Sequence, residues 1–195
     1  AGLEESLSPV SKEEREARYG QKPVTILLTG PPAAGKTPVA NALERKLFDI
    51  GRAVATIDGQ NMRRGLSRDL GFSTEDRSEN LRRAAEVAKT INQNGLITIA
   101  AFVAPQEAVR LKAADVIGKE NFLVVEVSAS EAWRREHDDQ GVYAKADAGE
   151  IINLVGVSLA YESPSNPDLV VKTDENSFDE CAAEIVKLLE DRGAI

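Results

Sequence analysis

The sequence predicts a three-layer α/β/α fold built on a mainly parallel β-sheet. Short, apolar, β-branched segments alternate along the chain with segments whose apolar residues recur at helical spacing. Strands separated by helices of this length form right-handed crossovers, which give a parallel sheet covered on both faces. A chain of 195 residues with 42% hydrophobic residues is long enough for one core and short for two.

Five apolar segments are predicted strands, at residues 24–30, 52–58, 96–104, 121–129 and 168–173. Helical spacing predicts helices at residues 38–51, 74–94, 106–118, 130–139 and 177–193, and a further short helix within residues 144–155. Ser73 and Asp76 resemble a capping box that opens the long helix, and Gly95 closes it. Residues 1–22 are polar with mixed charges, so we expect a leader or linker there and one domain at 23–195.

Composition excludes several classes of protein. The formal net charge of −8 argues against a nucleic-acid binder, which needs surplus Lys and Arg for the phosphate backbone. No segment has the roughly 20 apolar residues of a membrane span, and the polar beginning of the chain does not resemble a secretory signal. Cys181 is the single cysteine, which excludes an internal disulfide and fits a cytoplasmic protein; its amphipathic context favours a core residue over a nucleophile. One histidine cannot build a multi-histidine metal site, so oxygen ligands and Mg²⁺ are expected.

A phosphate-binding motif lies between the first predicted strand and the following helix. Residues 30–37 read GPPAAGKT and match G-x-x-x-x-G-K-[ST]. In this context the loop N–H groups and the helix N-terminus bind phosphate, Lys36 reaches its outer oxygens and the Thr37 hydroxyl ligates Mg²⁺. The expected ATP-binding residues of this segment are Gly30, Ala33, Ala34, Gly35, Lys36, Thr37 and Pro38. Pro38 lacks an N–H that could face a phosphate, and a glycine-rich turn carrying a lysine by chance is the alternative.

Asp58 ends the second predicted strand, at the edge where ligands of open α/β sheets bind. A carboxylate at this place can orient an acceptor hydroxyl, accept its proton or bind Mg²⁺ through water. The alternative is an aspartate that caps the turn DGQN.

Arginines gather in the segment that follows, at positions 63, 64, 68, 77, 82 and 83. Arg77 and Asn80 share a helix face that can meet the loop carrying Arg63. Guanidinium groups beside a phosphate loop suit an anionic acceptor, since they bind phosphate or sulfate oxygens bidentately. A solvated face paired with neighbouring glutamates is the alternative, and for Arg82 and Arg83 both interpretations stay open.

Several segments together resemble the adenylylsulfate kinase (APS kinase) family over about residues 20–192. They are GPPAAGKT, DGQNMRRGL, DLGFSTEDRSENLRRAAEVAK, AFVAP, GVYAKADAGEI and YESPSNPDLVV, in this order. The resemblance implies a P-loop NTPase-type fold, a kinase domain at 23–195 and transfer of the γ-phosphoryl group of MgATP to the 3′-hydroxyl of adenylyl sulfate. It also implies a homodimer. The leader and KADAGEI resemble kinase domains fused behind an ATP sulfurylase subunit.

The family's site residues fall on particular positions of this sequence. The resemblance makes Lys36 and Asp58 the catalytic residues, places Phe72 against the substrate adenine and His137 near the ATP adenine, and makes residues 137–145 a mobile lid. The substrate-binding residues it implies are Asp58, Gly59, Gln60, Asn61, Arg63, Phe72, Arg77, Asn80, Val103, Ala104, Gln140, Asn153 and Leu154.

Five positions depart from the family's pattern. Gln60 replaces the second carboxylate of D-G-D-N, Ala104 replaces a serine, His137 a lid arginine, Gln140 a lid lysine, and Leu154 a stacking phenylalanine. Two other functions therefore remain open: a nucleotide-binding regulatory domain with weak catalysis, and a P-loop kinase for another small metabolite.

Overall fold

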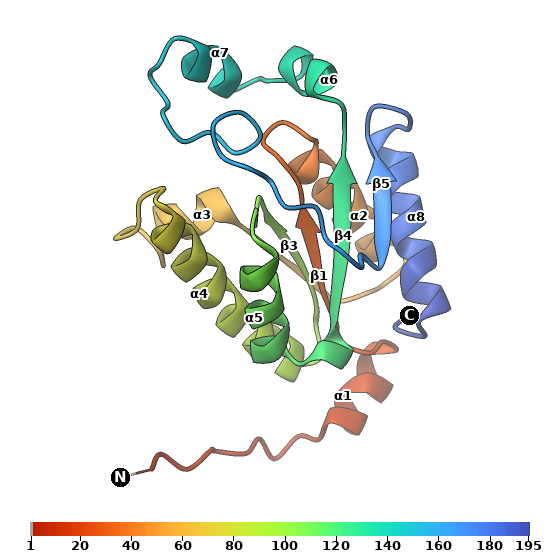
Figure 1. Cartoon of the computed structure of the whole chain (residues 1–195). Helices are drawn as coiled ribbons and strands as arrows, with labels where there is room; N and C mark the ends of the chain where they lie inside the picture. Colours follow the sequence, from red (N-terminus) through yellow and green to blue (C-terminus); the bar gives the residue numbers. More distant parts are fainter. Residues whose placement is uncertain (1) are drawn as a thin grey trace.

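The computed structural model describes residues 2–195, and its centre is one five-stranded sheet (Figure 1). The strands lie in the order β2-β3-β1-β4-β5, and every neighbouring pair is parallel. Their bounds are Thr25–Thr29 (β1), Val54–Asp58 (β2), Ile97–Phe102 (β3), Phe122–Ser128 (β4) and Leu169–Lys172 (β5). This topology confirms the predicted fold class.

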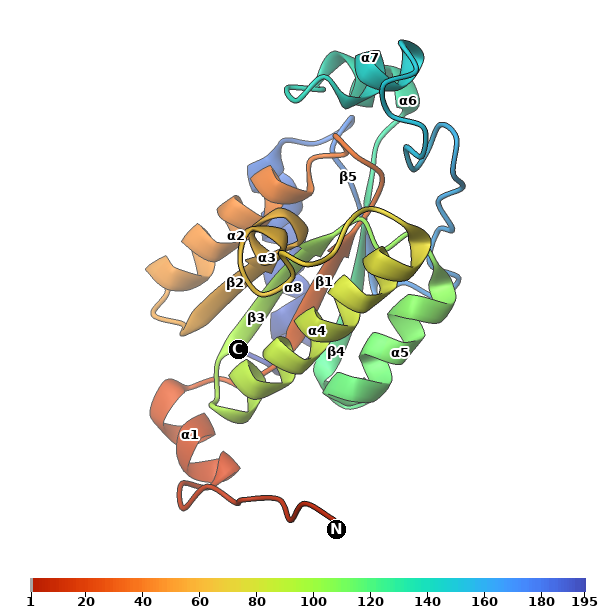
Figure 2. The ribbon, with the colours of Figure 1, turned by 90° about the vertical axis from the view of Figure 1, so that its left-hand side faces the viewer.

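Two pairs of helices cover the two faces of the sheet (Figures 1 and 2). The helices α2 (Lys36–Asp49) and α8 (Phe178–Asp191) lie on one face, and α4 (Thr74–Gln93) and α5 (Glu107–Ile117) lie on the other. Among residues 2–195 no helix is both long and apolar enough to cross a membrane.

The central strand β1 shows why the sheet is buried on both faces. Ile26 and Leu28 belong to the core beneath α2 and α8, which also contains the Cys181 side chain. Leu27 points to the opposite core, beneath α4 and α5. All five residues of β1 are buried, as a central parallel strand requires. Cys181 is fully buried and burial raises the pKa of its thiol to about 11, which confirms the core interpretation.

Three short helices follow strand ends and lie at the carboxyl edge of the sheet: α3 (Gly59–Arg64), α6 (Glu131–Glu136) and α7 (Val142–Asp147). A single 3-10 turn, Lys119–Asn121, precedes β4. The prediction of a short helix within residues 144–155 is confirmed by α7, which begins earlier, at Val142, and ends at Asp147, before Gly149 with its φ of +76°. The helix α3 was not predicted; six residues give too few turns for helical spacing to be visible.

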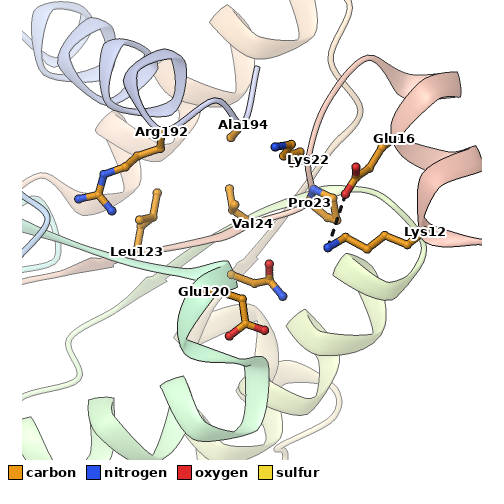
Figure 3. Close-up of a pocket in the computed structure, with 10 residues that line it drawn as sticks. Lys12, Glu16, Lys22, Pro23, Val24, Glu120, Leu123, Arg192 and Ala194 are labelled. Carbon is orange, nitrogen blue, oxygen red and sulfur yellow. Dashed lines mark ion pairs between the residues drawn. The ribbon is translucent and has the colours of Figure 1, made fainter.

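The predicted leader contains a helix, α1 (Lys12–Tyr19), that begins with a capping box formed by Ser11 and Glu14. This helix buries none of its residues. A cavity of about 170 Å³ lies between α1 and the base of the sheet. Figure 3 shows Lys12 and Glu16 on its α1 side and Leu123 opposite. Elsewhere on α1, Arg15 and Tyr19 lie against Gly95.

Firm attachment occurs just after α1, at the buried Gln21. Its Nε2 donates hydrogen bonds to the carbonyl oxygens of Ala53 (2.8 Å) and Gly95 (3.0 Å), and its Oε1 accepts one from the Ala53 N–H (3.0 Å). Gln21 thus joins the end of the predicted leader to the chain entering β2 and β3. The boundary at residue 22 stays a prediction.

We predict that Gln21→Ala lowers the free energy of unfolding by about 1–3 kcal/mol, because it leaves the buried Gly95 carbonyl and the Ala53 N–H without partners, while the Ala53 carbonyl keeps the Ile97 N–H. Lys12→Ala is the control, since its exposed ion pair with Glu16 (3.6 Å) contributes about 0–1 kcal/mol. Urea unfolding measures both. Equal midpoints for Gln21→Ala and the parent would show that the Gln21 contacts do not stabilise the domain.

Candidate active site

The loop between β1 and α2 depends on two glycines. A Cβ on Gly30 would lie 2.4 Å from the Val127 carbonyl oxygen, so the loop leaves the sheet in contact with β4. Gly35 has a φ of +98°, and a Cβ there would lie 2.9 Å from the Phe178 ring. A side chain at either position would push the loop away from its supports, and glycine permits the left-handed turn that leads into α2.

Two side chains from distant segments fix this loop. The buried Thr173, after β5, donates from Oγ1 to the carbonyl oxygen of Ala34 at 2.6 Å. The Tyr143 hydroxyl of α7 donates to the carbonyl oxygen of Pro32 at 2.8 Å. Tyr143 lies within the predicted lid and Thr173 outside every predicted site segment; neither contact with the loop was predicted, because both arise from tertiary structure.

Lys36 turns back into the loop that it follows. Its Nζ donates to the carbonyl oxygens of Gly30 and Pro31, both at 2.8 Å. The residue as a whole is half-buried, but its ammonium group lies within the loop, and this burial, with the nearby Arg134 charge, lowers the Lys36 pKa to about 7. Thr37 is exposed in the first turn of α2, where Pro38 is also exposed.

Asp58 caps α3. Its Oδ1 accepts hydrogen bonds from the backbone N–H groups of Gln60 (3.0 Å) and Asn61 (2.8 Å), and its Oδ2 accepts one from Asn61 Nδ2 (2.7 Å). The capping interpretation is therefore confirmed, and it leaves an acceptor site free on Oδ2 because each carboxylate oxygen accepts about two hydrogen bonds. Next to this cap, Gln60 Nε2 donates to Gln140 Oε1 of the predicted lid at 3.1 Å.

A cluster of polar groups lies where α3 meets α4. Arg63 donates to the carbonyl oxygens of Gly71 (3.1 Å) and Gly59 (3.3 Å). Burial lowers the pKa of both Arg63 and Arg77, and the charge of the nearby Arg77 lowers that of Arg63 further. Arg77 Nη1 is buried without a partner, as is Oδ1 of Asn80. Buried polar atoms without partners are costly; an anionic ligand would accept from Arg77 Nη1, and a hydroxyl group of a ligand would donate to Asn80 Oδ1.

The predicted adenine contacts differ in exposure. Phe72 is 67% exposed, and the Arg63 guanidinium lies 4.6 Å from its ring centroid, which leaves the other ring face open. Arg77 Nη2 donates to the Asn153 carbonyl oxygen at 3.0 Å, so the predicted closing loop does reach this cluster. Leu154 is buried and its N–H donates to Ser158 Oγ at 2.9 Å.

The backbone of Val103 and Ala104 is held by protein donors. The Val103 carbonyl oxygen accepts from Thr29 Oγ1 at 2.7 Å, and that of Ala104 accepts from the buried Arg110 at 2.6 Å. Ala104 has a φ of +43°, which is uncommon outside glycine. Both carbonyl oxygens therefore have partners, and a ligand at this place would meet the Ala104 turn itself.

His137 lies at the end of α6, exposed and stacked on Trp133 with ring centroids 3.8 Å apart. Trp133 in turn makes an edge contact with Phe178, 6.3 Å between centroids, and Phe178 is the ring that lies against Gly35. An aromatic group thus connects the predicted adenine contact His137 to the phosphate loop.

Arg82 and Arg83 have local acidic partners. Arg82 pairs with Glu79 at 2.7 Å, and Arg83 pairs with Glu79 at 2.9 Å and with Asp69 at 2.6 Å. The interpretation of these two arginines as a paired surface is therefore the correct one. Among the six arginines at positions 63–83, the buried guanidinium nitrogen without a partner belongs to Arg77.

Comparison with known proteins assigns this arrangement. The family model described as adenylylsulphate kinase matches residues 22–172, which is most of the chain. The chain belongs to the adenylylsulphate kinase family. It is 54% identical over 191 residues to the bifunctional enzyme CysN/CysC of Rhodopirellula baltica, a match that covers 98% of this chain and 30% of that protein. It is 40% identical over 188 residues to an adenylyl-sulfate kinase of Staphylococcus carnosus, covering 96% of this chain and 94% of that protein.

A solved structure agrees with this assignment. The Mycobacterium tuberculosis APS kinase CysC, in complex with AMPPNP and APS, is 38% identical, with a TM-score of 0.83. That match covers 87% of this chain and 99% of the other. Together the comparisons confirm the predicted family, P-loop kinase fold and enzyme class, an ATP-dependent adenylylsulfate kinase.

We predict that ATP binding takes up about one proton near pH 8, because Lys36 with a pKa of about 7 is then largely neutral and an adjacent phosphate raises that pKa. Calorimetric titration in buffers of different ionisation enthalpy measures the uptake. Lys36→Arg is the control, since a guanidinium stays protonated at this pH and its variant should take up none. Equal proton uptake by the parent and Lys36→Arg would exclude Lys36 as the titrating group.

Proposed function

We propose that this chain transfers the γ-phosphoryl group of ATP to the 3′-hydroxyl of adenylyl sulfate, forming 3′-phosphoadenylyl sulfate. The observation that carries the choice of acceptor is the cluster of Arg63, Arg77 and Asn80. Two of its buried polar atoms, Arg77 Nη1 and Asn80 Oδ1, lack partners. A phosphosulfate and its ribose supply both the acceptors and the donor that these atoms need.

Lys36 and Thr37 would hold the transferring end of ATP, with Mg²⁺. Among residues 2–195 no group of three or more His, Cys, Asp or Glu side chains could hold a metal. The Thr37 hydroxyl would supply one oxygen ligand, which fits Mg²⁺ in a kinase, because that ion is held by one or two protein oxygens together with phosphates and water. With Thr37 exposed at the start of α2, the ion would neutralise charge on the phosphates.

Asp58 would orient the acceptor hydroxyl through the free acceptor site of Oδ2. Its three hydrogen bonds from Gln60 and Asn61 fix the carboxylate at the end of β2. A carboxylate held in this way positions a hydroxyl without first reorganising, which is the main contribution a protein makes to phosphoryl transfer.

Closure of the site would come from two loops. Gln140 reaches the Asp58 turn through Gln60, and the Asn153 carbonyl reaches Arg77. Gly59, Val103, Ala104 and Leu154 would line the walls. His137, stacked on Trp133, would contact the ATP adenine.

The assembly and setting are also proposals. A homodimer and a fusion or association with an ATP sulfurylase are what the sequence resemblance implies, and a bifunctional relative supports the second. A cytoplasmic setting suits a reaction that consumes ATP and a chain whose single cysteine is buried.

A coupled assay of ADP release tests the activity. The expected result is release that depends on adenylyl sulfate and is absent without acceptor or with sugars and nucleosides. ATP binding without release under any condition would support the regulatory domain, and release with another acceptor alone would support a different metabolite kinase.

We predict that Phe72→Ala weakens adenylyl sulfate binding roughly ten- to a hundredfold and leaves ATP binding nearly unchanged, since base stacking on an aromatic ring is worth about 1–3 kcal/mol. Phe72→Tyr keeps the ring and serves as the control. Calorimetric titration with each nucleotide gives the affinities. An equal loss for ATP and adenylyl sulfate would place Phe72 outside the acceptor pocket.

We also predict that Asp58→Asn slows turnover on the order of a hundredfold or more, whereas Gln60→Asp changes the rate within about tenfold. Asparagine is a good N-cap, so Asp58→Asn keeps α3 and removes the charge that orients the hydroxyl. Initial rates at saturating MgATP with varied adenylyl sulfate compare the variants. Rescue of an inactive parent by Gln60→Asp alone would overturn this assignment of roles.

A further inference from the structure

Arg134 lies at the mouth of the phosphate loop, although it belongs to a different part of the chain. It is in α6, which follows β4 at the carboxyl edge of the sheet (Figure 1). Its Nη1 donates to the Ala129 carbonyl oxygen at 3.1 Å. A Cβ built on Gly156 would lie 3.8 Å from Arg134 Nη2 and 3.5 Å from Cβ of Pro31. The guanidinium therefore lies beside the loop whose Pro31 carbonyl accepts from Lys36.

This guanidinium is poorly satisfied by the protein. Its Nε is buried without a hydrogen-bond partner. Arg135, the next residue, has acidic partners: it pairs with Glu131 and with Asp147, both at 2.8 Å, and its guanidinium lies 5.1 Å from the Tyr143 ring centroid. Since an unpartnered buried donor is costly, Arg134 is placed for a ligand and Arg135 for the surface.

Arg134 also lies near a second cation, Lys36, and no carboxylate in the described part of the chain pairs with either group. Within residues 2–195 neither Lys36 nor Arg134 forms an ion pair with a carboxylate. Burial lowers the pKa of Lys36, and the Arg134 charge lowers it further. Two desolvated cations beside one loop destabilise each other, and an anion between them removes that cost.

We propose that Arg134 is a second phosphate-binding cation, which contacts the outer phosphates of ATP from the side of the loop opposite Lys36. The proposal rests on the proposed kinase function and adds a residue to its nucleotide site. The planar guanidinium can donate two parallel hydrogen bonds to phosphate oxygens, from Nε and one Nη, which also gives its unpaired Nε a partner. The tether from Tyr143 to Pro32 holds the α6–α7 segment against the loop, so Arg134 is in place before ATP binds.

Binding of ATP and of inorganic tripolyphosphate, measured by calorimetry in EDTA, tests the proposal without a metal or an acceptor. We expect Arg134→Gln to weaken both ligands by roughly tenfold, about 1.4 kcal/mol. Arg134→Lys should recover part of the loss, because it restores the charge and not the fork. Arg135→Gln removes the same charge from the neighbouring residue and should leave both affinities within about twofold of the parent.

Comparing ATP with tripolyphosphate distinguishes a direct contact of Arg134 with phosphate from an indirect, structural effect of the substitution. A loss for ATP with unchanged tripolyphosphate binding would mean that Arg134 acts through the base or the lid, and would overturn the proposal. Equal losses in Arg134→Gln and Arg135→Gln, unchanged affinities in Arg134→Gln, or a parent that binds ATP and not tripolyphosphate would overturn it as well. Thermal unfolding of each variant confirms that it is folded. Failure of the parent to phosphorylate adenylyl sulfate would count against the proposed function and leave this measurement valid.

Discussion

The parallel order of the five strands is the constraint on which the site depends. Because all strands run in one direction, the loops that follow β1, β2, β3 and β4 leave the sheet at the same edge. Residues as distant in the chain as Lys36, Asp58, Ala104 and Arg134 are therefore neighbours in one region. The loop after β1 passes close to β4, because Gly30 has no side chain to collide with the Val127 carbonyl. The burial of β1 on both faces keeps this edge rigid.

The arginines of this acidic protein differ in whether a carboxylate pairs with them. On the outer surface of α4, Arg82 and Arg83 have acidic partners, as does Arg135 on α6. At the carboxyl edge Arg77 and Arg134 keep buried nitrogens without partners, as Arg15 and Arg52 do elsewhere in the fold. A desolvated cation without a partner is costly, and at the carboxyl edge an anionic ligand would offset that cost. The number of arginines in the sequence does not show which of them pair with carboxylates and which do not.

Sequence reasoning succeeded where local rules and tertiary structure agree. The GPPAAGKT loop, the buried strand before it and the cap at Ser73 were readable because each is set by residues a few positions apart. It missed α3, which has six residues, and it missed the start of α7 at Val142. Thr173, Tyr143 and Arg134 carry no local signal. Thr173 and Tyr143 reach the loop from 139 and 111 positions away, and such contacts are properties of the assembled sheet.

The contact between Gln60 and Gln140 gives two of the sequence's departures one physical explanation. By resemblance, the first position is usually a carboxylate and the second a lid lysine, and here both are glutamine. The structure places them in direct contact, Nε2 of one donating to Oε1 of the other at 3.1 Å. Loss of one negative and one positive charge at touching positions leaves the local charge unchanged, and an amide pair can keep the hydrogen bond that an ion pair would make. The lid therefore retains its link to the Asp58 turn. Asp58 remains as the single carboxylate of that turn, which places the burden of orienting the acceptor on it alone.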